Sequence, residues 1–229
     1  MKKYLFFDLD GTITDSGEGI RKCVQYALES FGMVEEDVDK LNLFIGPPLE
    51  VSFKKVYGFD NEKVWEGVHK YRERYETDGW KENKLYEGFE EVLKAAKAAG
   101  KTCVLATSKP EVFALRIIEY FGLTSYFDVM TGADLEGKHV SKDKVITTSL
   151  NRLSDLIFKQ TGEKPDMDEL IADSIMIGDR ENDIWGAHQN AMESCGVRYG
   201  FAKPDELEDE GADYIVDTVA ELAKFVAEI

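Results

Sequence analysis

The segment FFDLDGT, residues 6–12, places two aspartates, Asp8 and Asp10, directly after an apolar run. That run, residues 4–7, is continuous rather than alternating in polarity, which is typical of a strand buried on both faces of a parallel sheet. Open α/β sheets carry their ligand crevice at the carboxyl ends of their strands, where Asp8 and Asp10 would then lie. Because Asp and Gly are also common in turns, the segment taken alone fits a turn as well as a functional site.

The rest of the chain alternates between predicted strands and predicted helices. Short apolar runs are expected to form strands at residues 102–106, 126–131, 174–178, 194–198 and 213–216. Helices are expected between and after them at residues 88–99, 110–121, 142–160, 182–192 and 217–227. This pattern predicts an α/β fold with a doubly wound parallel sheet.

Residues 15–82 interrupt the alternation. They are expected to form consecutive helices at residues 18–31, 47–57 and 61–78, with the loop FIGPP at residues 44–48 among them. A run of helices placed directly after the first strand indicates an all-helical cap domain, residues 15–82, inserted into a core domain of residues 1–14 and 83–229. Residues 154–173 lengthen a later helix and loop and suggest no function.

Composition limits the compartment and the partners. The chain has 229 residues, 43% of them hydrophobic, and only three cysteines, which suits one core with an insertion and a reducing compartment. Its net charge of −17 repels nucleic acid and anionic lipid. No apolar stretch approaches the roughly 18 residues of a membrane span, and the first strand follows the N-terminus without a cleavable signal. We expect a cytoplasmic monomer or homodimer with no nucleic-acid or membrane partner.

A second acidic pair follows another buried-looking strand, in the segment MIGDREND at residues 176–183. Alone, this segment fits a helix start with Asp179 or Asn182 as the N-cap. Neighbouring parallel strands bring their carboxyl ends to one edge, however, so Asp8, Asp10, Asp179 and Asp183 can converge. Gathered acids repel and raise one another's pKa, and a hard divalent cation such as Mg²⁺ relieves that repulsion.

Two further segments fit the same edge. Thr107 and Ser108 follow a strand in the segment TSKP, where they either cap the next helix or bind a phosphate together with its free backbone N–H groups. Lys142, in VSKDKVI, opens the next long helix. A lone lysine is usually a solvated surface charge, but beside an acidic site one ammonium can hold a carboxylate and a phosphate together.

The order of these motifs resembles the haloacid dehalogenase superfamily of phosphohydrolases. DLDGT, a hydroxyl after a second strand, a lysine and then GDRENDI span residues 8–183, and the helical insertion resembles that superfamily's all-helical cap. The chain is most similar to phosphoglycolate phosphatase-like proteins and related 5'-nucleotidase-like members, where a Gly-Pro-Pro cap loop also occurs. The lysine motif departs from the common Lys-Pro form, because Lys142 precedes Asp143, so Lys144 remains an alternative.

The resemblance implies a role for each motif residue. Asp8 would be the nucleophile that forms an aspartyl-phosphate, and Asp10 the general acid and base. Mg²⁺ would be held by Asp8, the Asp10 backbone carbonyl and Asp179, with Asp183 nearby or bound through water. Thr107 and Lys142 would act in catalysis by binding the transferring phosphoryl group. The phosphate- and substrate-binding positions would be Leu9, Gly11, Thr107, Ser108 and Lys142 in the core and Arg21, Phe44 and Pro47 in the cap.

The resemblance leaves the substrate open. It implies a small phosphorylated metabolite, phosphoglycolate-like in the first instance, with 5'-nucleotidase and phosphosugar phosphatase or mutase activities as alternatives. Arg21 is also compatible with a solvated surface charge. A phosphoacceptor signalling module is the alternative from another class, since it too places acids, a hydroxyl and a lysine on a doubly wound sheet. Such a module takes its phosphoacceptor from a middle strand and fits in about half this length.

Overall fold

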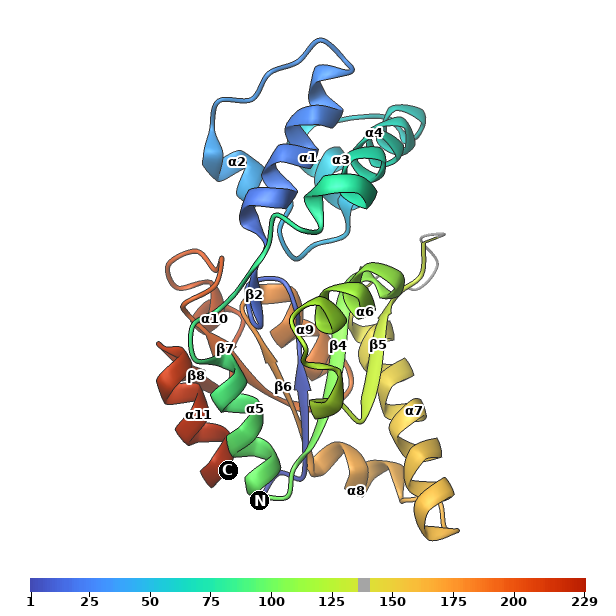
Figure 1. Ribbon diagram of the computed structural model, residues 1–229, viewed down its shortest axis with the longest axis vertical. Helices are drawn as coiled ribbons and strands as arrows, with labels where there is room; N and C mark the ends of the chain where they lie inside the picture. Colours follow the sequence, from blue (N-terminus) through green and yellow to red (C-terminus); the bar gives the residue numbers. More distant parts are fainter. Residues whose placement is uncertain (136–140) are drawn as a thin grey trace.

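A six-stranded parallel sheet forms the centre of the molecule, which the computed structural model describes over residues 1–135 and 141–229 (Figure 1). The strand order is β5-β4-β1-β6-β7-β8. The strands are β1 (Tyr4–Phe7), β4 (Thr102–Pro110), β5 (Val129–Ala133), β6 (Ser174–Gly178), β7 (Glu193–Val197) and β8 (Tyr214–Val216). This confirms the predicted α/β fold. Since β1 pairs with both β4 and β6, the segments that follow these three strands meet at one edge.

Helices cover both faces of the sheet. The helices of this layer are α5 (Phe89–Ala98), α6 (Glu111–Tyr120), α7 (Lys142–Thr161), α8 (Met167–Ala172), α9 (Glu181–Gln189), α10 (Glu206–Asp209) and α11 (Val219–Glu228), with a 3-10 turn η2 (Thr124–Tyr126). Phe7 packs in the cluster that contains α5, α6 and α11, whereas its neighbour Phe6 packs with α7, α8 and α9. Successive strand residues point to opposite faces, which explains the continuous apolar run of β1.

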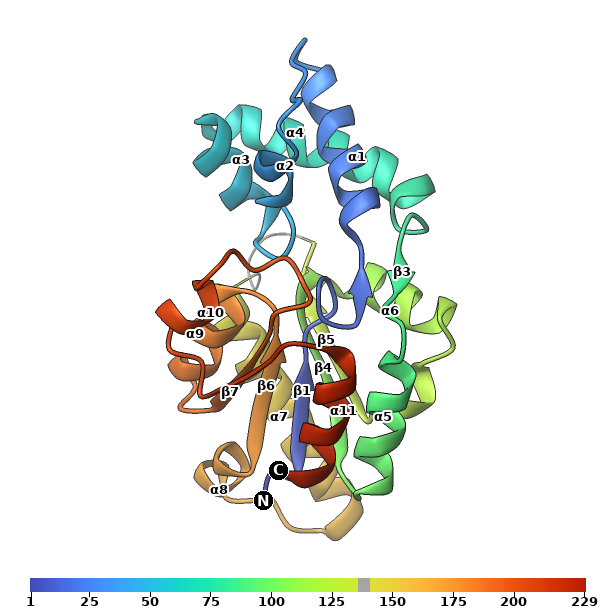
Figure 2. The same ribbon diagram turned by 90° about the vertical axis from the view of Figure 1, so that its left-hand side faces the viewer.

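A separate group of helices lies beyond the carboxyl edge of the sheet (Figure 2). It consists of α1 (Gly17–Glu29), α2 (Val38–Asn42), α3 (Leu49–Tyr57), α4 (Asn61–Arg74) and a π-helical turn η1 (Tyr75–Gly79). We call residues 17–79 the helical insertion. It has its own hydrophobic cluster, built around Phe44, Phe53 and Phe59. The short antiparallel strands β2 (Thr14–Asp15) and β3 (Lys84–Leu85) connect it to the sheet layer.

Some local structure differs from the prediction. The strand expected at residues 126–131 begins at Val129, because residues 124–126 form the turn η2. The short helices α2 and α8 were not predicted. Their N-caps, Asp37 and Asp166, accept hydrogen bonds from backbone N–H groups of the first turn, which stabilises helices too short to show an apolar period. The segment 154–173 therefore contains the end of α7, a turn and α8.

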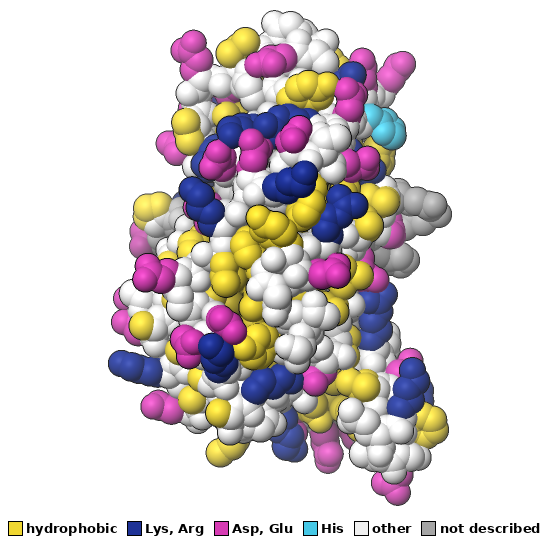
Figure 3. Space-filling view, viewed as in Figure 1, with side chains coloured by type: hydrophobic (Ala, Val, Ile, Leu, Met, Phe, Trp, Pro, Cys, Tyr) yellow, Lys and Arg dark blue, Asp and Glu magenta, His cyan; other side chains and the backbone are white. Residues whose placement is uncertain are grey.

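The surface agrees with the acidic composition. On the face shown in Figure 3, acidic side chains are scattered over both the helical insertion and the sheet layer, with basic side chains between them. Within residues 1–135 and 141–229, no helix has the length and apolar character needed to cross a bilayer.

Candidate active site

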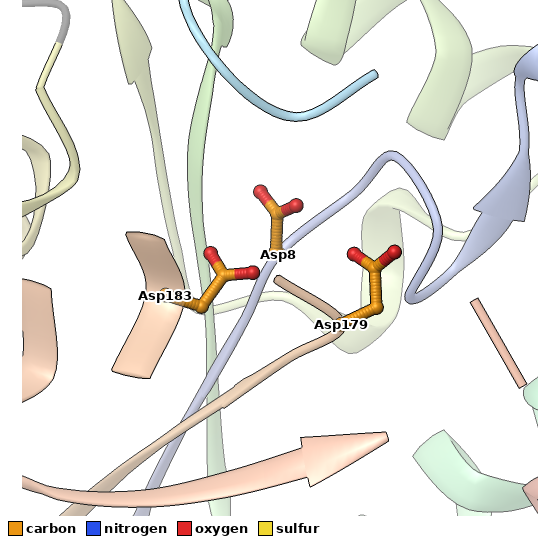
Figure 4. Close-up of side chains that lie close together, drawn as sticks. All are labelled: Asp8, Asp179 and Asp183. Atoms are coloured by element: carbon orange, nitrogen blue, oxygen red, sulfur yellow. The ribbon is translucent and has the colours of Figure 1, made fainter. Parts of the chain in front are cut away.

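Three buried carboxylates meet at the carboxyl edge of the sheet (Figure 4). Asp8 follows β1, Asp179 follows β6, and Asp183 lies in the first turn of α9. One oxygen of each lies within 4.8 Å of an oxygen of the other two. Because β1 and β6 are adjacent and in parallel register, the two aspartates that follow them are held side by side.

Two glycines allow the carboxylates to approach the backbone this closely. Gly11 has a φ of +86°, and a Cβ there would lie 2.1 Å from an Asp179 oxygen. At Gly178 a Cβ would lie 2.3 Å from the carboxyl carbon of Asp183. Any larger residue would displace these side chains, so both glycines are required by the packing of the site. Gly11, expected to bind phosphate, thus also fits against Asp179.

Lys142 joins two of the three acids. Its Nζ donates to Asp8 Oδ1 at 2.6 Å and forms an ion pair with Asp183 Oδ1 at 2.7 Å. The same Nζ donates to the Ala106 carbonyl at 3.0 Å, which fixes the ammonium at the end of β4. Lys142 is only 2% exposed, whereas Lys144 is exposed on the surface. Of the two lysines left open by the sequence, the structure brings Lys142 to the acids.

The acids strongly influence one another's ionisation. Burial raises the pKa of Asp8 to about 6, the Lys142 ammonium opposes that shift, and repulsion from Asp183 adds to it. Burial also raises the pKa of Asp179 well above its usual range, with repulsion from Asp183 and Asp8 contributing. Although burial alone would lower the pKa of Lys142, Asp183 and Asp8 raise it. One ammonium does not balance three carboxylates, so the site favours a further cation.

The donor set fits a divalent metal ion. Both oxygens of Asp183 are engaged, one by Lys142 and the other by the Arg180 backbone N–H at 3.1 Å. The oxygens of Asp179 accept from the Phe201 N–H at 2.7 Å and from the Thr12 hydroxyl at 3.5 Å, which orients this carboxylate. Clustered carboxylate oxygens are the ligands that hard cations such as Mg²⁺ prefer. Asp8, Asp179 and Asp183 together therefore supply the oxygen atoms that such an ion would need.

The side chain of Asp10 lies apart from this group. Both of its carboxylate oxygens accept from Lys109 Nζ, at 2.9 and 2.8 Å, and that ammonium lies 4.8 Å from the centre of the Tyr75 ring. Lys109 is buried, and sequence reasoning missed it. Its position in TSKP, directly after Thr107 and Ser108, could have indicated that Lys109 also lies at the site.

The predicted hydroxyl residues occupy the adjacent strand end. Thr107 is buried, and its hydroxyl accepts from the Lys109 N–H at 3.2 Å. The Ser108 hydroxyl is buried and has no hydrogen-bond partner among the residues that the structure describes. Leu9 contributes differently, because its side chain packs in the hydrophobic core and only its backbone lies at the turn.

A cavity of about 70 Å³ lies between this edge and the helical insertion. Asp10, Ser108, Lys109 and Phe113 line it from the sheet layer. The residues that line it from the insertion include Phe44, Gly46, Pro47, Tyr71, Arg72 and Tyr75. Phe44 and Pro47, two of the predicted substrate-binding positions, are among these lining residues. Arg21 does not line the cavity, and its guanidinium instead donates to Asn42 at 3.0 Å.

The chain also matches a known protein family. The profile of the haloacid dehalogenase-like hydrolase family matches residues 5–197. The chain belongs to this family. This confirms the resemblance read from the four motifs.

Individual relatives of the chain carry several names. A 5'-nucleotidase from Pseudomonas aeruginosa is 41% identical over 204 residues, which cover 89% of this chain and 86% of the relative. Tyrosine-protein kinase PtkA of Mycobacterium tuberculosis is 31% identical over 89% of this chain but only 65% of its own length. A phosphoglycolate phosphatase from Agrobacterium fabrum is 28% identical, over 94% of this chain and 88% of the relative.

A solved structure matches the whole chain. A predicted phosphatase from Clostridium acetobutylicum superposes with a TM-score of 0.89 at 43% identity, with 100% of both chains covered. Together with the family match and the phosphatase names, this supports a phosphoric monoester hydrolase, as predicted.

Arg180 is a second residue of this hydrolase that sequence reasoning missed. It follows Asp179 directly, is 4% exposed, and reaches across to the helical insertion, where its Nη1 donates to the Ile45 carbonyl at 2.5 Å. Its Nε donates to Glu206 at 2.7 Å. The Arg180 side chain also packs 3.1 Å from the position a Cβ would take at Gly46. One buried side chain thus links the metal-site turn to the loop that carries Phe44 and Pro47.

Proposed function

We propose that this protein hydrolyses small phosphomonoesters with Mg²⁺, through an aspartyl-phosphate formed on Asp8. The observation that carries the proposal is the division of the four acids. Asp8, Asp179 and Asp183 form one buried group around Lys142, whereas Asp10 lies apart at the wall of the cavity with its own lysine. Such a separation suits a nucleophile and a proton-transfer group with distinct tasks.

In the first step an oxygen of Asp8 attacks phosphorus. The bond between phosphorus and the leaving oxygen breaks, and that oxygen takes a proton from Asp10. Lys142 holds the other oxygen of Asp8 and offsets negative charge on the transferring group. Thr107 and Ser108, at the end of β4, bind the phosphoryl oxygens.

In the second step water replaces the Asp8 carboxylate on phosphorus. Asp10, now ionised, accepts a proton from this water, the bond from phosphorus to Asp8 breaks, and inorganic phosphate leaves. Substrate and water are converted into alcohol and phosphate, and both aspartates return to their starting states. A bound Mg²⁺ would supply charge neutralisation between the carboxylates and the phosphoryl oxygens.

The helical insertion is proposed to act as a cap domain, residues 15–82, over a core of residues 1–14 and 83–229. Its residues line the cavity together with Asp10, Ser108 and Lys109 of the sheet layer, so substrate selection is assigned to it. The first candidate substrate is a small acid of the phosphoglycolate type. A nucleoside 5'-monophosphate is the second, supported by the 41% identical relative and by the aromatic residues Phe44, Tyr71 and Tyr75 in the cavity wall.

The test is phosphate release from a panel of esters with and without Mg²⁺. The panel contains 2-phosphoglycolate, nucleoside monophosphates, sugar phosphates, pyrophosphate and p-nitrophenyl phosphate. We expect repeated turnover that stops in excess chelator and returns when Mg²⁺ is restored. Full activity in chelator would contradict the metal assignment. A chain that takes up one phosphoryl group and keeps it would instead be a phosphoacceptor module.

A further inference from the structure

A buried ion pair joins Asp10 to Lys109 at the wall of the cavity. Lys109 Nζ donates to both carboxylate oxygens of Asp10, at 2.9 and 2.8 Å. The side chain of Lys109 is only 5% exposed and that of Asp10 only 8%. A contact to both oxygens fixes the plane of the carboxylate as well as its position. The proposed reaction needs this carboxylate in a defined place, because it exchanges a proton first with the leaving oxygen and then with water.

The strand that carries Lys109 leaves its regular pairing at this point. Residues 107–109 of β4 lie opposite Gly132 of β5 alone, where regular strands would pair one residue with one. A Cβ at Gly132 would lie 2.7 Å from the Lys109 carbonyl oxygen, so this close approach of β4 requires a glycine. Bulges beside active sites commonly redirect a side chain. The irregularity thus places Lys109 where its ammonium reaches Asp10.

Aromatic rings enclose the pair. The centre of the Tyr75 ring, which belongs to the helical insertion, lies 4.8 Å from Lys109 Nζ. Tyr75 is itself buried, stacked on Tyr71 and in edge contact with Phe113 of α6. Such rings exclude water, and an ion pair shielded from water is held more firmly than an exposed one. The Lys109 ammonium is therefore confined between the Asp10 carboxylate and the Tyr75 ring.

We propose that Lys109 is a positioning residue for proton transfer, which acts on the reaction only through Asp10. In the first step Asp10 gives its proton to the leaving oxygen, and the carboxylate that forms stays paired with Lys109, which keeps all of its own protons. In the second step the same carboxylate accepts a proton from water while Lys109 holds it in place. Lys142 has a separate task beside Asp8. This inference rests on the proposed phosphatase function and adds the residue that places its acid–base group.

The experiment asks whether Lys109 matters once Asp10 can no longer transfer a proton. Lys109→Met, Asp10→Asn and the double variant are compared with the wild-type chain on p-nitrophenyl phosphate and Mg²⁺. kcat, KM and the hydroxylamine-sensitive phosphoenzyme after an acid quench are measured for each. The double variant leaves no unpaired charge of the buried pair, so it is expected to fold even if Lys109→Met does not. Lys3→Met is the matched control, because Lys3 also pairs with an aspartate, Asp173, but is exposed at the opposite end of β1.

We expect Lys109→Met to lower kcat by about 10- to 100-fold, the usual range for residues that orient a functional group, with KM within about 3-fold of wild type. The phosphoenzyme should rise above the wild-type level. Its formation from this weakly basic leaving group needs little proton donation, whereas its hydrolysis needs the Asp10 carboxylate. The double variant should turn over within about 2-fold of Asp10→Asn, since the effects of residues that act as a unit are not additive. Lys3→Met should match the wild type in every measurement.

A double variant that is roughly 10-fold or more slower than Asp10→Asn would overturn the proposal, because Lys109 would then contact the substrate itself. A raised KM with less phosphoenzyme in Lys109→Met would indicate the same direct contact and also overturn it. So would a wild-type kcat in Lys109→Met, or slower turnover without extra phosphoenzyme, which a purely structural role would produce. Failure of the proposed function gives a different result, since the wild-type protein would then release no phosphate from any ester, including p-nitrophenyl phosphate.

Discussion

The sheet edge and the helical insertion face each other across the cavity but are built in different ways. At the sheet edge, charged side chains are almost fully buried, and the register of adjacent strands fixes the positions of Asp8 and Asp179. On the insertion side, aromatic rings and Arg72 line the wall, held by packing between helices. We infer from this difference that strand register positions the proposed catalytic groups, while the helical insertion selects the substrate.

Replacing Lys142 should produce the largest effect among the variants that separate the two regions. Lys142→Ala leaves Asp8 and Asp183 as unpaired buried carboxylates, at a cost of about 3–5 kcal/mol in the free energy of unfolding. It should also lower kcat by about 10²- to 10³-fold on every ester, because one preorganised charge is lost. Phosphate release and thermal unfolding measure both effects.

The control for this prediction is Lys144→Ala, which removes an exposed lysine two residues away on the same helix. It should change neither kcat nor the melting temperature noticeably. If Lys144→Ala costs as much activity as Lys142→Ala, the lysine of the site has been assigned wrongly.

An intermediate effect is expected where the two regions touch. Arg180→Gln removes the hydrogen bond to the Ile45 carbonyl and the ion pair with Glu206. The loop of residues 43–48 should loosen, with about a 10-fold loss in kcat/KM, which corresponds to one charge-assisted hydrogen bond. Limited proteolysis should cut this loop faster in the variant.

Arg198→Gln serves as the control, since Arg198 also forms ion pairs, with Glu208 and Asp217, but is exposed on the surface. It should leave kinetics and proteolysis unchanged. An Arg180→Gln protein that keeps wild-type KM and loop protection would show that the two regions are coupled by other contacts.

The smallest effect is expected within the insertion itself. Phe44 lines the cavity and packs against the Phe53 ring, with 4.8 Å between ring centres. Phe44→Leu should change the ranking of esters by a few-fold while the best ester keeps its kcat, because the chemistry lies on the other wall. Arg21→Gln should change the ranking less, since Arg21 does not line the cavity. A proportional loss on all esters in Phe44→Leu would contradict this division.

The same contrast explains how much the sequence could predict. Asp8, Asp179 and Asp183 could be placed together because apolar runs mark the strands, and parallel register brings the strand ends to one edge. Lys142 could be expected there from its position at the start of a helix after a strand. These inferences need only local patterns and one rule of topology.

The contacts across the cavity could not be predicted in this way. Lys109 and Arg180 are positioned by tertiary partners, namely Asp10 and the Ile45 carbonyl. Periodicity in the sequence does not indicate which side chains of the insertion face the sheet. Arg21 was therefore predicted as a substrate-binding residue, whereas Arg72, which lines the cavity, was not. The short helices α2 and α8 could not be predicted from the sequence for a related reason, since side-chain caps and packing stabilise them.

The central claim is the division of labour between Asp8 and Asp10, and trapping the phosphoenzyme tests it most directly. Asp8→Asn, Asp10→Asn and wild-type protein are mixed with radiolabelled p-nitrophenyl phosphate and Mg²⁺, quenched in acid and treated with hydroxylamine, which cleaves acyl phosphates. Proton donation matters less for this weakly basic leaving group, so Asp10→Asn should still phosphorylate Asp8 but lose about 10²- to 10⁴-fold in turnover. We predict more hydroxylamine-sensitive label in Asp10→Asn than in wild type, and none in Asp8→Asn. Label on Asp8→Asn, or normal turnover by Asp10→Asn, would contradict the account.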